Sequence, residues 1–267
     1  MRTLSKGSYY GKKKFETHID GIVLSEYDYL VSQTDWHYHE NPYFMYILNG
    51  DLYDINKKEK SVCQAGSFLL HNWQEAHYNK KDSQFARGFH VEFESNWFNS
   101  KKLNLDLWEG SKLLQNPELH VIIGKLYYEF KCNDIFSNIA IELLLLELCE
   151  KIENQDHRSN TNEPIWVPKL KELLHHSDAN ITLQHLSDEL GIHPVHLSRS
   201  VPKYLNVSLG DYLRQLKVKH AISYLSESKM NLLDITHACG FADQSHFIRT
   251  FKKYIGSTPS QYRKKIA

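Results

Sequence analysis

The sequence predicts an α+β protein in two parts: a β-rich amino-terminal part with trailing helices, followed by an all-α part. Three observations predict this division. Short apolar runs separated by turn-like stretches fill residues 15–95, apolar residues at three- and four-residue spacing follow in 107–153, and the chain after Ile165 has a helical pattern throughout. At 267 residues the chain has room for two domains of about 100–200 residues each.

Composition excludes several classes of protein. Hydrophobic residues make up 41% and charged residues 24%, which is enough apolar material for a core in each part and argues against disorder. The four cysteines form no CxxC pair, so we expect neither a zinc ribbon nor a disulfide framework. The amino-terminal residues lack the apolar segment of a secretion signal. The most apolar run, 139–148, is about half of the ~20 residues that a membrane helix needs. We therefore expect a cytoplasmic protein without a membrane partner.

Charge is distributed unevenly along the chain. From residue 164 onward there are 14 Lys and Arg against 8 Asp and Glu, whereas the preceding part has 18 basic and 24 acidic residues. This asymmetry favours a carboxyl-terminal part that contacts a polyanion.

The elements follow in order. Residues 44–48 (FMYIL) and 67–71 (SFLLH) are typical of strands, with turns at 49–51 and 79–83, so residues 1–106 are predicted to form a β-sandwich or barrel. A helical extension is predicted over 107–153. Its first helix is indicated by Leu113, Leu114, Leu119, Ile122, Ile123, Leu126 and Phe130, and its second spans Ile135 to Ile152. The polar segment 154–164, which ends in a proline, is predicted to be a linker.

The helical part, 165–267, contains an internal repeat. Leu183, Leu186 and Gly191 recur 49 residues later as Leu232, Ile235 and Gly240, and Arg199, Tyr204, Ser208 and Tyr212 recur 50 residues later as Arg249, Tyr254, Thr258 and Tyr262. Each copy has an amphipathic helix, a glycine that permits a tight turn, and a second helix with an exposed Arg. This is the pattern of a helix-turn-helix, here present twice.

The repeat resembles the DNA-binding domain of the AraC/XylS family of transcriptional regulators. The matching stretches are LSDELGIHPVHLSR (186–199), SLGDYLRQLKVKHAISYL (208–225) and DITHACGFADQSHFIRTFKKYIGSTPSQYR (234–263). The resemblance implies a double-stranded DNA partner, RNA polymerase as a further partner, and an activator function. It also implies that the helix 209–226 sets the two recognition helices about one DNA turn, ~34 Å, apart.

The resemblance assigns residues to the DNA contact. In the first module the exposed positions are Val195, His196, Ser198 and Arg199, and in the second they are Gln244, Ser245, His246 and Arg249. Arg can bond guanine O6 and N7, Gln can pair with adenine, and Val can contact a thymine methyl group. Lys252, Lys253 and Lys264 are expected to attract phosphates.

The first module departs from the family pattern at Pro202. Proline lacks the N–H that would bond to the carbonyl of Ser198, so we expect the first recognition helix to kink or to end early. Asn206 stands where the family usually has glycine, which is tolerable because Asn also accepts a left-handed helix cap.

Two segments of the β-rich part resemble the cupin motifs, 37–50 and 66–77. Metal-binding cupins have a His-x-His pair, a Glu four residues on and a later His. Here His37, His39 and His77 match, but Tyr43 stands at the Glu position, and Glu40 would point away from the pair along a strand. Three imidazoles can still hold zinc or copper. Because sensor domains of this family generally bind no metal, our expectation is a site without a metal or cofactor.

An organic effector is the alternative ligand for this part. Candidate ligand-binding residues are side chains that each have an aromatic ring for stacking and a polar group for hydrogen bonding: Trp36, His37, His39, Tyr46, His71, Trp73, His77 and His90. By resemblance the helices at 109–153 form a homodimer interface, although packing against the barrel alone would also explain them.

Three functions follow from these patterns. The first is a ligand-responsive, sequence-specific transcription regulator that is not an enzyme. The second is a metal-binding cupin enzyme fused to a DNA-binding domain, and the third is a constitutive DNA binder whose barrel only dimerises. The sequence names neither the effector nor the operator.

Overall fold

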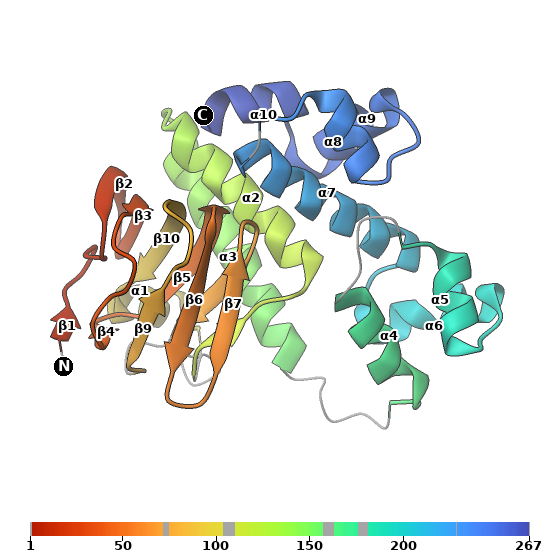
Figure 1. The fold of residues 1–267 in the computed structure, drawn as a ribbon, viewed down its shortest axis with the longest axis horizontal. Coiled ribbons are helices and arrows are strands. Elements are labelled where there is room, and N and C mark those ends of the chain that lie inside the picture. Colours follow the sequence, from red (N-terminus) through yellow and green to blue (C-terminus); the bar gives the residue numbers. More distant parts are fainter. Residues whose placement is uncertain are drawn as a thin grey trace.

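A computed structural model describes residues 2–71, 75–103, 110–156, 163–175, 181–227 and 229–266. The amino-terminal part is built of two sheets that pack face to face (Figure 1). In spatial order the first sheet consists of β1 (Arg2–Leu4), β4 (His37–His39), β9 (His77–Lys80), β6 (Asp51–Asn56) and β7 (Lys60–Gln64). The second consists of β11 (Lys112–Leu113), β8 (Phe68–His71), β5 (Tyr43–Asn49), β10 (Ala86–Phe93), β3 (Ile22–Tyr29) and β2 (Lys12–Ile19). A short helix, α1 (Ser95–Lys101), follows β10.

Alternation along β5 separates two buried environments. Tyr43, Met45 and Ile47 point into the space between the two sheets, where they pack with Leu52 of β6. Phe44 and Tyr46 point to the opposite face and pack under the helices. The strand is buried on both faces, and for this reason it is apolar throughout instead of alternating with polar residues.

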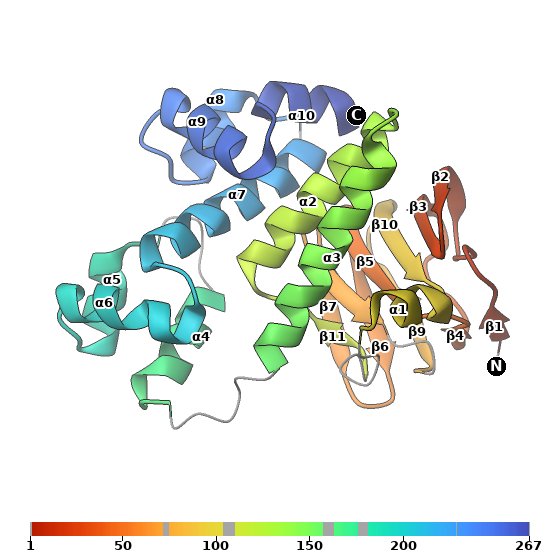
Figure 2. The same cartoon turned by 180° about the vertical axis from the view of Figure 1, so that it is seen from behind.

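Two helices cover the outer face of the second sheet (Figure 2). The first, α2 (Pro117–Cys132), begins with Pro117 at its first position, and the side chain of Asn116 accepts a hydrogen bond of 2.9 Å from the amide of Glu118. The second, α3 (Ser137–Asp156), extends three residues into the segment predicted as a linker.

The predicted start of the first covering helix is wrong. Leu113 belongs to β11, and the amide of Leu114 bonds to the carbonyl of Phe68 at 2.8 Å. Their apolar spacing reflects a strand added at the sheet edge beside β8 and not a helical face. Asn116 and Pro117 start the helix after this strand.

The carboxyl-terminal part is all-α. It contains α4 (Trp166–His175), α5 (Leu183–Leu190), α6 (Pro194–Leu205), α7 (Leu209–Glu227), α8 (Leu232–Ala238), α9 (Gln244–Ile255) and α10 (Pro259–Ile266). The pair α5–α6 lies at one end of α7 and the pair α8–α9 lies at the other (Figures 1 and 2). The fold class predicted from the sequence, an α+β chain with a cupin-like front part and two helix-turn-helix modules, is confirmed.

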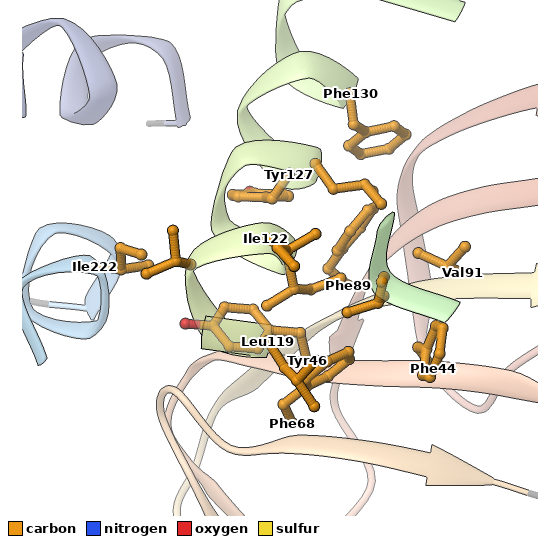
Figure 3. Close-up of a cluster of buried hydrophobic side chains, with 14 of the residues drawn as sticks. Phe44, Tyr46, Phe68, Phe89, Val91, Leu119, Ile122, Tyr127, Phe130 and Ile222 are labelled. Atoms are coloured by element: carbon orange, nitrogen blue, oxygen red, sulfur yellow. The ribbon is translucent and has the colours of Figure 1, made fainter. Parts of the chain in front are cut away.

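The buried cores do not follow the division into two parts. The first module has a core of its own, with Leu186, Leu197, Val201 and Leu209. The second module shares one continuous core with α2, α3 and the second sheet. Figure 3 shows Ile222 of α7 directed at α2, with Tyr46 of β5 below Leu119. The second module is therefore packed on the sensor part, whereas the first is joined to it through α7.

The predicted domain boundaries at 106, 153 and 164 remain predictions, because residues 104–109 and 157–162 lie outside the described residues. No helix in the described part of the chain has both the length and the apolar character needed to cross a membrane.

Candidate nucleic-acid interface and sensor interior

Both helix-turn-helix turns have the backbone that the repeat predicts. Gly191 closes α5 with a φ of 64°, and Gly240 follows α8 with a φ of 66°. These left-handed conformations are accessible to glycine without a steric penalty. Thr182 caps α5 and Asn231 caps α8 through their side-chain oxygens. The two modules therefore have the same local construction.

The two recognition helices match in length, with 12 residues each. Four fully buried residues anchor the two helices: Leu197 and Val201 hold α6 on the core of the first module, and Phe247 and Phe251 hold α9 on the core shared with the sensor part. Asp243 caps α9 by accepting a hydrogen bond of 2.7 Å from the amide of His246.

The candidate DNA contacts lie on the outer faces of the two modules. Seven positions on the recognition helices are exposed: Val195, His196, Ser198, Arg199, Gln244, Ser245 and Arg249. His246 is half-buried, with its ring edge-on to Phe241 at 5.4 Å. Lys252, Lys253 and Lys264 are exposed. The roles of these residues in binding remain a prediction.

The predicted early end of the first recognition helix is wrong. The helix α6 continues through Pro202 to Leu205, and the amide of Asn206 bonds to the carbonyl of Pro202 at 3.1 Å. Pro202 and Ser198 both lie on the exposed side, where water can bond the carbonyl that proline leaves without a partner. As expected, Asn206 takes the left-handed cap, with a φ of 62°.

Asp211 ties the second recognition helix to α7. Its Oδ1 accepts hydrogen bonds from Arg214 Nη2 at 2.7 Å and from the Tyr254 hydroxyl at 3.1 Å. The hydrogen bond from Arg214 is the main reason why the pKa of Asp211 falls to about 2. Asp211 therefore stays ionised at neutral pH and links α7 to α9 through the hydroxyl of Tyr254.

In the sensor part, five of the predicted ligand-binding residues converge between the two sheets. These are His37, His39, His71, His77 and His90, and all are buried. His37 pairs with His77 across β4 and β9, and the rings of His71 and His77 stack with their centroids 4.7 Å apart. Burial lowers the pKa of His71, His77 and His90 to about 3. These imidazoles are therefore neutral at physiological pH.

Three other predicted ligand residues lie elsewhere or cannot be placed. Trp36 is 39% exposed and packs against Tyr78 on the surface. Tyr46 is buried on the opposite face of β5 from the histidines, because it is an odd number of residues from Tyr43 (Figure 3). Neither residue lies among the histidines, and their part in ligand binding remains a prediction. Trp73 lies outside the described residues.

Sequence reasoning missed several residues of the interior. The ring of Tyr9 stacks on His90 at 3.7 Å, and the Tyr29 hydroxyl lies 2.8 Å from His90 Nε2. Asp54 is buried beside His71, with Asp54 Oδ1 and His71 Nε2 3.9 Å apart. The signal for Asp54 was available, since Leu52, Asp54 and Asn56 alternate and share the inward face of β6.

The interior is nearly filled. The cavity lined by His37, His39, Tyr43 and His90 has a volume of about 30 Å³, room for about one water molecule. A larger cavity of about 520 Å³ lies between the sensor part and α7, where Gly66 and His120 face Lys219 and Ser223. The larger free volume therefore lies between the parts, and little lies among the histidines.

Comparison with known proteins agrees with the two modules. A helix-turn-helix domain family matches residues 186–265. The Msm operon regulatory protein of Streptococcus mutans is 27% identical over 164 residues, which cover 61% of this chain and 51% of that protein. The transcriptional activator RhaR of Escherichia coli is 27% identical over 182 residues, which cover 61% of this chain and 64% of that protein. The chain thus spans about half to two thirds of the length of these curated relatives.

Among solved structures, ToxT of Vibrio cholerae is 15% identical, with 93% of this chain and 99% of that chain covered and a TM-score of 0.36. That superposition is loose. The paired modules and the sequence relatives agree that residues 186–265 form a helix-turn-helix domain, similar to that of the AraC/XylS family of transcriptional regulators.

Proposed function

We propose that this protein is a sequence-specific transcription regulator that binds double-stranded DNA with both helix-turn-helix modules. One observation carries the proposal: two recognition helices of equal length, each anchored by buried apolar residues, present exposed Arg, Ser and other polar side chains on their outer faces. The names of the relatives, an operon regulator and a transcriptional activator, favour regulation and specifically activation.

We assign base contact to side chains that project from the recognition helices and have no ion-pair partner among the described residues. Among the described residues neither Arg199 nor Arg249 forms an ion pair. Both guanidinium groups are therefore available for bidentate bonds to guanine. Lys252, Lys253 and Lys264 lie on or beyond the end of the second recognition helix and supply phosphate contacts.

A signal from the sensor part has a direct physical route to the DNA contact. The second module shares its core with α2, and the 520 Å³ cavity is lined by residues of both parts. An effector that bound there more tightly in one arrangement of the modules than in another would shift the equilibrium, with a coupling of about 1–3 kcal/mol.

Homodimerisation is proposed through α3 and the residues before it. Ile135, Phe136, Ile139 and Leu143 are 63–86% exposed, an arrangement that is unfavourable in water unless another surface covers it. We place the protein in the cytoplasm, where it would meet DNA and RNA polymerase.

The test is selection of genomic DNA fragments by the purified full chain, followed by footprinting on the enriched site. We expect protection of two neighbouring major grooves on one face of the duplex and loss of enrichment in the double variant Arg199→Ala/Arg249→Ala. Lys14→Ala, at an exposed residue of β2, is the matched charge control. Equal retention of random and genomic DNA by the wild-type protein would disprove sequence-specific binding.

A further inference from the structure

A cavity of about 520 Å³ lies between the sensor part and α7. Its sensor side is formed by the end of the β6–β7 hairpin, by β11 and by the start of α2, and its other side is one face of α7. The lining is mostly polar. Pockets of about 300–1,000 Å³ commonly hold small molecules, so this cavity has room for a polar metabolite.

Lys219 brings a positive charge into this cavity. Its side chain is partly buried, and among the described residues no carboxylate lies within ion-pair distance of its ammonium group. Burial lowers the pKa of Lys219 to about 8, so at neutral pH the ammonium group is charged but poorly solvated. A cation in such a place lowers the stability of the fold, and an anion that contacts it would offset that loss.

His120 shows that the Lys219 charge reaches the inner wall of the cavity. The pKa of the buried His120 lies well below its usual range, chiefly because of burial and next because of the positive charge of Lys219. His120 Nδ1 lies 3.0 Å from the carbonyl oxygen of Asn116, which only accepts, so Nδ1 carries the hydrogen of a neutral ring. His120 therefore adds no positive charge, and an anion at this end would meet Lys219.

The opposite end of the cavity is acidic. Lys219, Ser223 and Glu227 are spaced four residues apart on one face of α7, which places the Cα atoms of Lys219 and Glu227 about 12 Å apart. The side-chain amide of Asn49 donates a hydrogen bond of 3.2 Å to the carbonyl oxygen of Glu227, so the nearby Asp51 lies at this end as well. Carboxylates accept hydrogen bonds from hydroxyl groups and repel a second negative charge.

The turn between β7 and β8 narrows the cavity between these two ends. A Cβ at Gly66 would collide with the Ser223 hydroxyl, so this close approach of the turn to α7 requires glycine. The Ser223 hydroxyl donates a hydrogen bond of 3.3 Å to the carbonyl oxygen of Lys219, and its own oxygen can still accept one. Ser223 can therefore bond to the middle of a molecule that spans the cavity.

We propose that this cavity binds a small polyhydroxylated organic anion, of the sugar-phosphate or sugar-acid class, and this assignment rests on the regulator function proposed above because it names the class of its effector. The phosphate or carboxylate group contacts Lys219, and the hydroxyl groups donate to Ser223, Asp51 and Glu227. A neutral sugar lacks the group that offsets the Lys219 charge. An alkyl carboxylate would place its chain against polar side chains and deprive them of water.

The first experiment measures binding of four probes to the full-length protein by isothermal titration calorimetry: glucose 6-phosphate, glucuronate, glucose and octanoate. We expect at least one of the two sugar anions to saturate at one molecule per chain, and neither glucose nor octanoate to bind. Lys219→Met should weaken binding at least tenfold, whereas Lys12→Met, at an exposed lysine of β2, should leave it unchanged. Melting curves establish that both variants are folded.

Three outcomes of this titration overturn the proposal. They are the absence of saturable binding for both sugar anions, equal binding by the wild-type protein and Lys219→Met, and binding of octanoate or glucose as tight as that of the sugar anions. A difference between glucose 6-phosphate and glucuronate tells whether the site takes a phosphate or a carboxylate.

The second experiment locates the anion. Full-length protein is treated briefly with acetic anhydride at pH 8, and mass spectrometry measures acetylation of each lysine with and without the sugar anion that binds. We expect protection of Lys219 and none of Lys12. Protection confined to Lys252 and Lys253, together with weaker binding in Arg199→Ala/Arg249→Ala, would place the anion on the predicted DNA-binding face and overturn the proposal. Footprinting without the anion tests the regulator function by itself, so the two proposals can fail separately.

Discussion

The hydroxyl of Tyr262, in the last helix, donates a hydrogen bond of 3.1 Å to the backbone carbonyl of Gly124, in the helix that covers the sensor sheet. Tyr262 is fully buried and its ring stacks on Tyr128 with centroids 5.6 Å apart. Residues 138 positions apart are thereby joined across the boundary between sensor and DNA-binding parts. The second module is held to the sensor by a polar bond as well as by apolar packing.

Tyr262→Phe should lower the free energy of unfolding by about 0.5–1.5 kcal/mol, because one buried hydrogen bond is lost while the Gly124 carbonyl keeps its bond within α2. Urea denaturation followed by tyrosine and tryptophan fluorescence measures the change. Tyr38→Phe, at a half-buried tyrosine of β4, is the control and should be close to neutral. An unchanged midpoint for Tyr262→Phe would mean that water replaces the bond without loss.

Gly124→Ala should disturb the packing of α2 against α7. A Cβ at Gly124 would lie 2.6 Å from Ile222 Cδ1, so the buried Ile222 side chain must shift against its neighbours, at about 1–3 kcal/mol. Ile222→Val removes that methyl group, and the next nearest atom lies 3.5 Å away. The double variant should therefore be more stable than Gly124→Ala alone in thermal melts. Additive losses in the two single variants would contradict this contact as the cause.

Arg249→Ala should cost about 1–3 kcal/mol on the enriched operator and less on random DNA, if Arg249 bonds a base bidentately. Lys264→Ala should lower binding on all sequences and reduce the salt slope by about one unit. Gel-shift titrations at several salt concentrations measure both effects. Arg199→Ala should also weaken operator binding, because α6 has the same length as α9. An equal loss on both DNAs would reduce Arg249 to a phosphate contact.

Pro202→Lys should raise the melting temperature without changing the ends of α6. Proline in a helix interior costs about 3 kcal/mol relative to Ala, but α6 already continues past it to Leu205, so part of that cost has been relieved. Differential scanning calorimetry and amide exchange of Lys203 to Asn206 would measure the gain and the helix boundary. A drop in melting temperature would show that the helix depends on the rigidity of proline.

Lys219 should make the free energy of unfolding rise with pH between about 8 and 10.5. Desolvation lowers its pKa from 10.5 to about 8, so between these values the unfolded chain binds more protons than the folded one. The destabilisation that comes from burying the charged Lys219 ammonium is fully present below pH 8 and disappears as pH rises toward 10.5. Lys219→Met should stabilise the protein by about 1–3 kcal/mol at pH 7 and by much less at pH 10. The comparison uses urea midpoints of the two proteins at each pH, and a difference that does not depend on pH would exclude this titration.

Local pattern determined much of this protein from sequence alone. The turn glycines Gly191 and Gly240, the buried anchors Leu197 and Phe247, and the exposed positions of both recognition helices follow from helical periodicity, which acts over a few residues. The same holds for His37 and His39, which share the inward face of one strand because they are two residues apart.

Only the tertiary structure decided which surfaces meet. Tyr43 and Tyr46 lie in one strand, yet Tyr46 packs under α2 and Tyr43 packs beside the histidines. The cupin-like motif could not assign these faces, because it does not reveal what covers each side of the sheet. The hydrogen bond from Tyr262 to Gly124 links residues 138 positions apart in sequence. Asp54 and His71 meet although their strands belong to different sheets. Alternation along β6 places Asp54 on an inward face, but the residue that it meets there depends on burial against another chain segment.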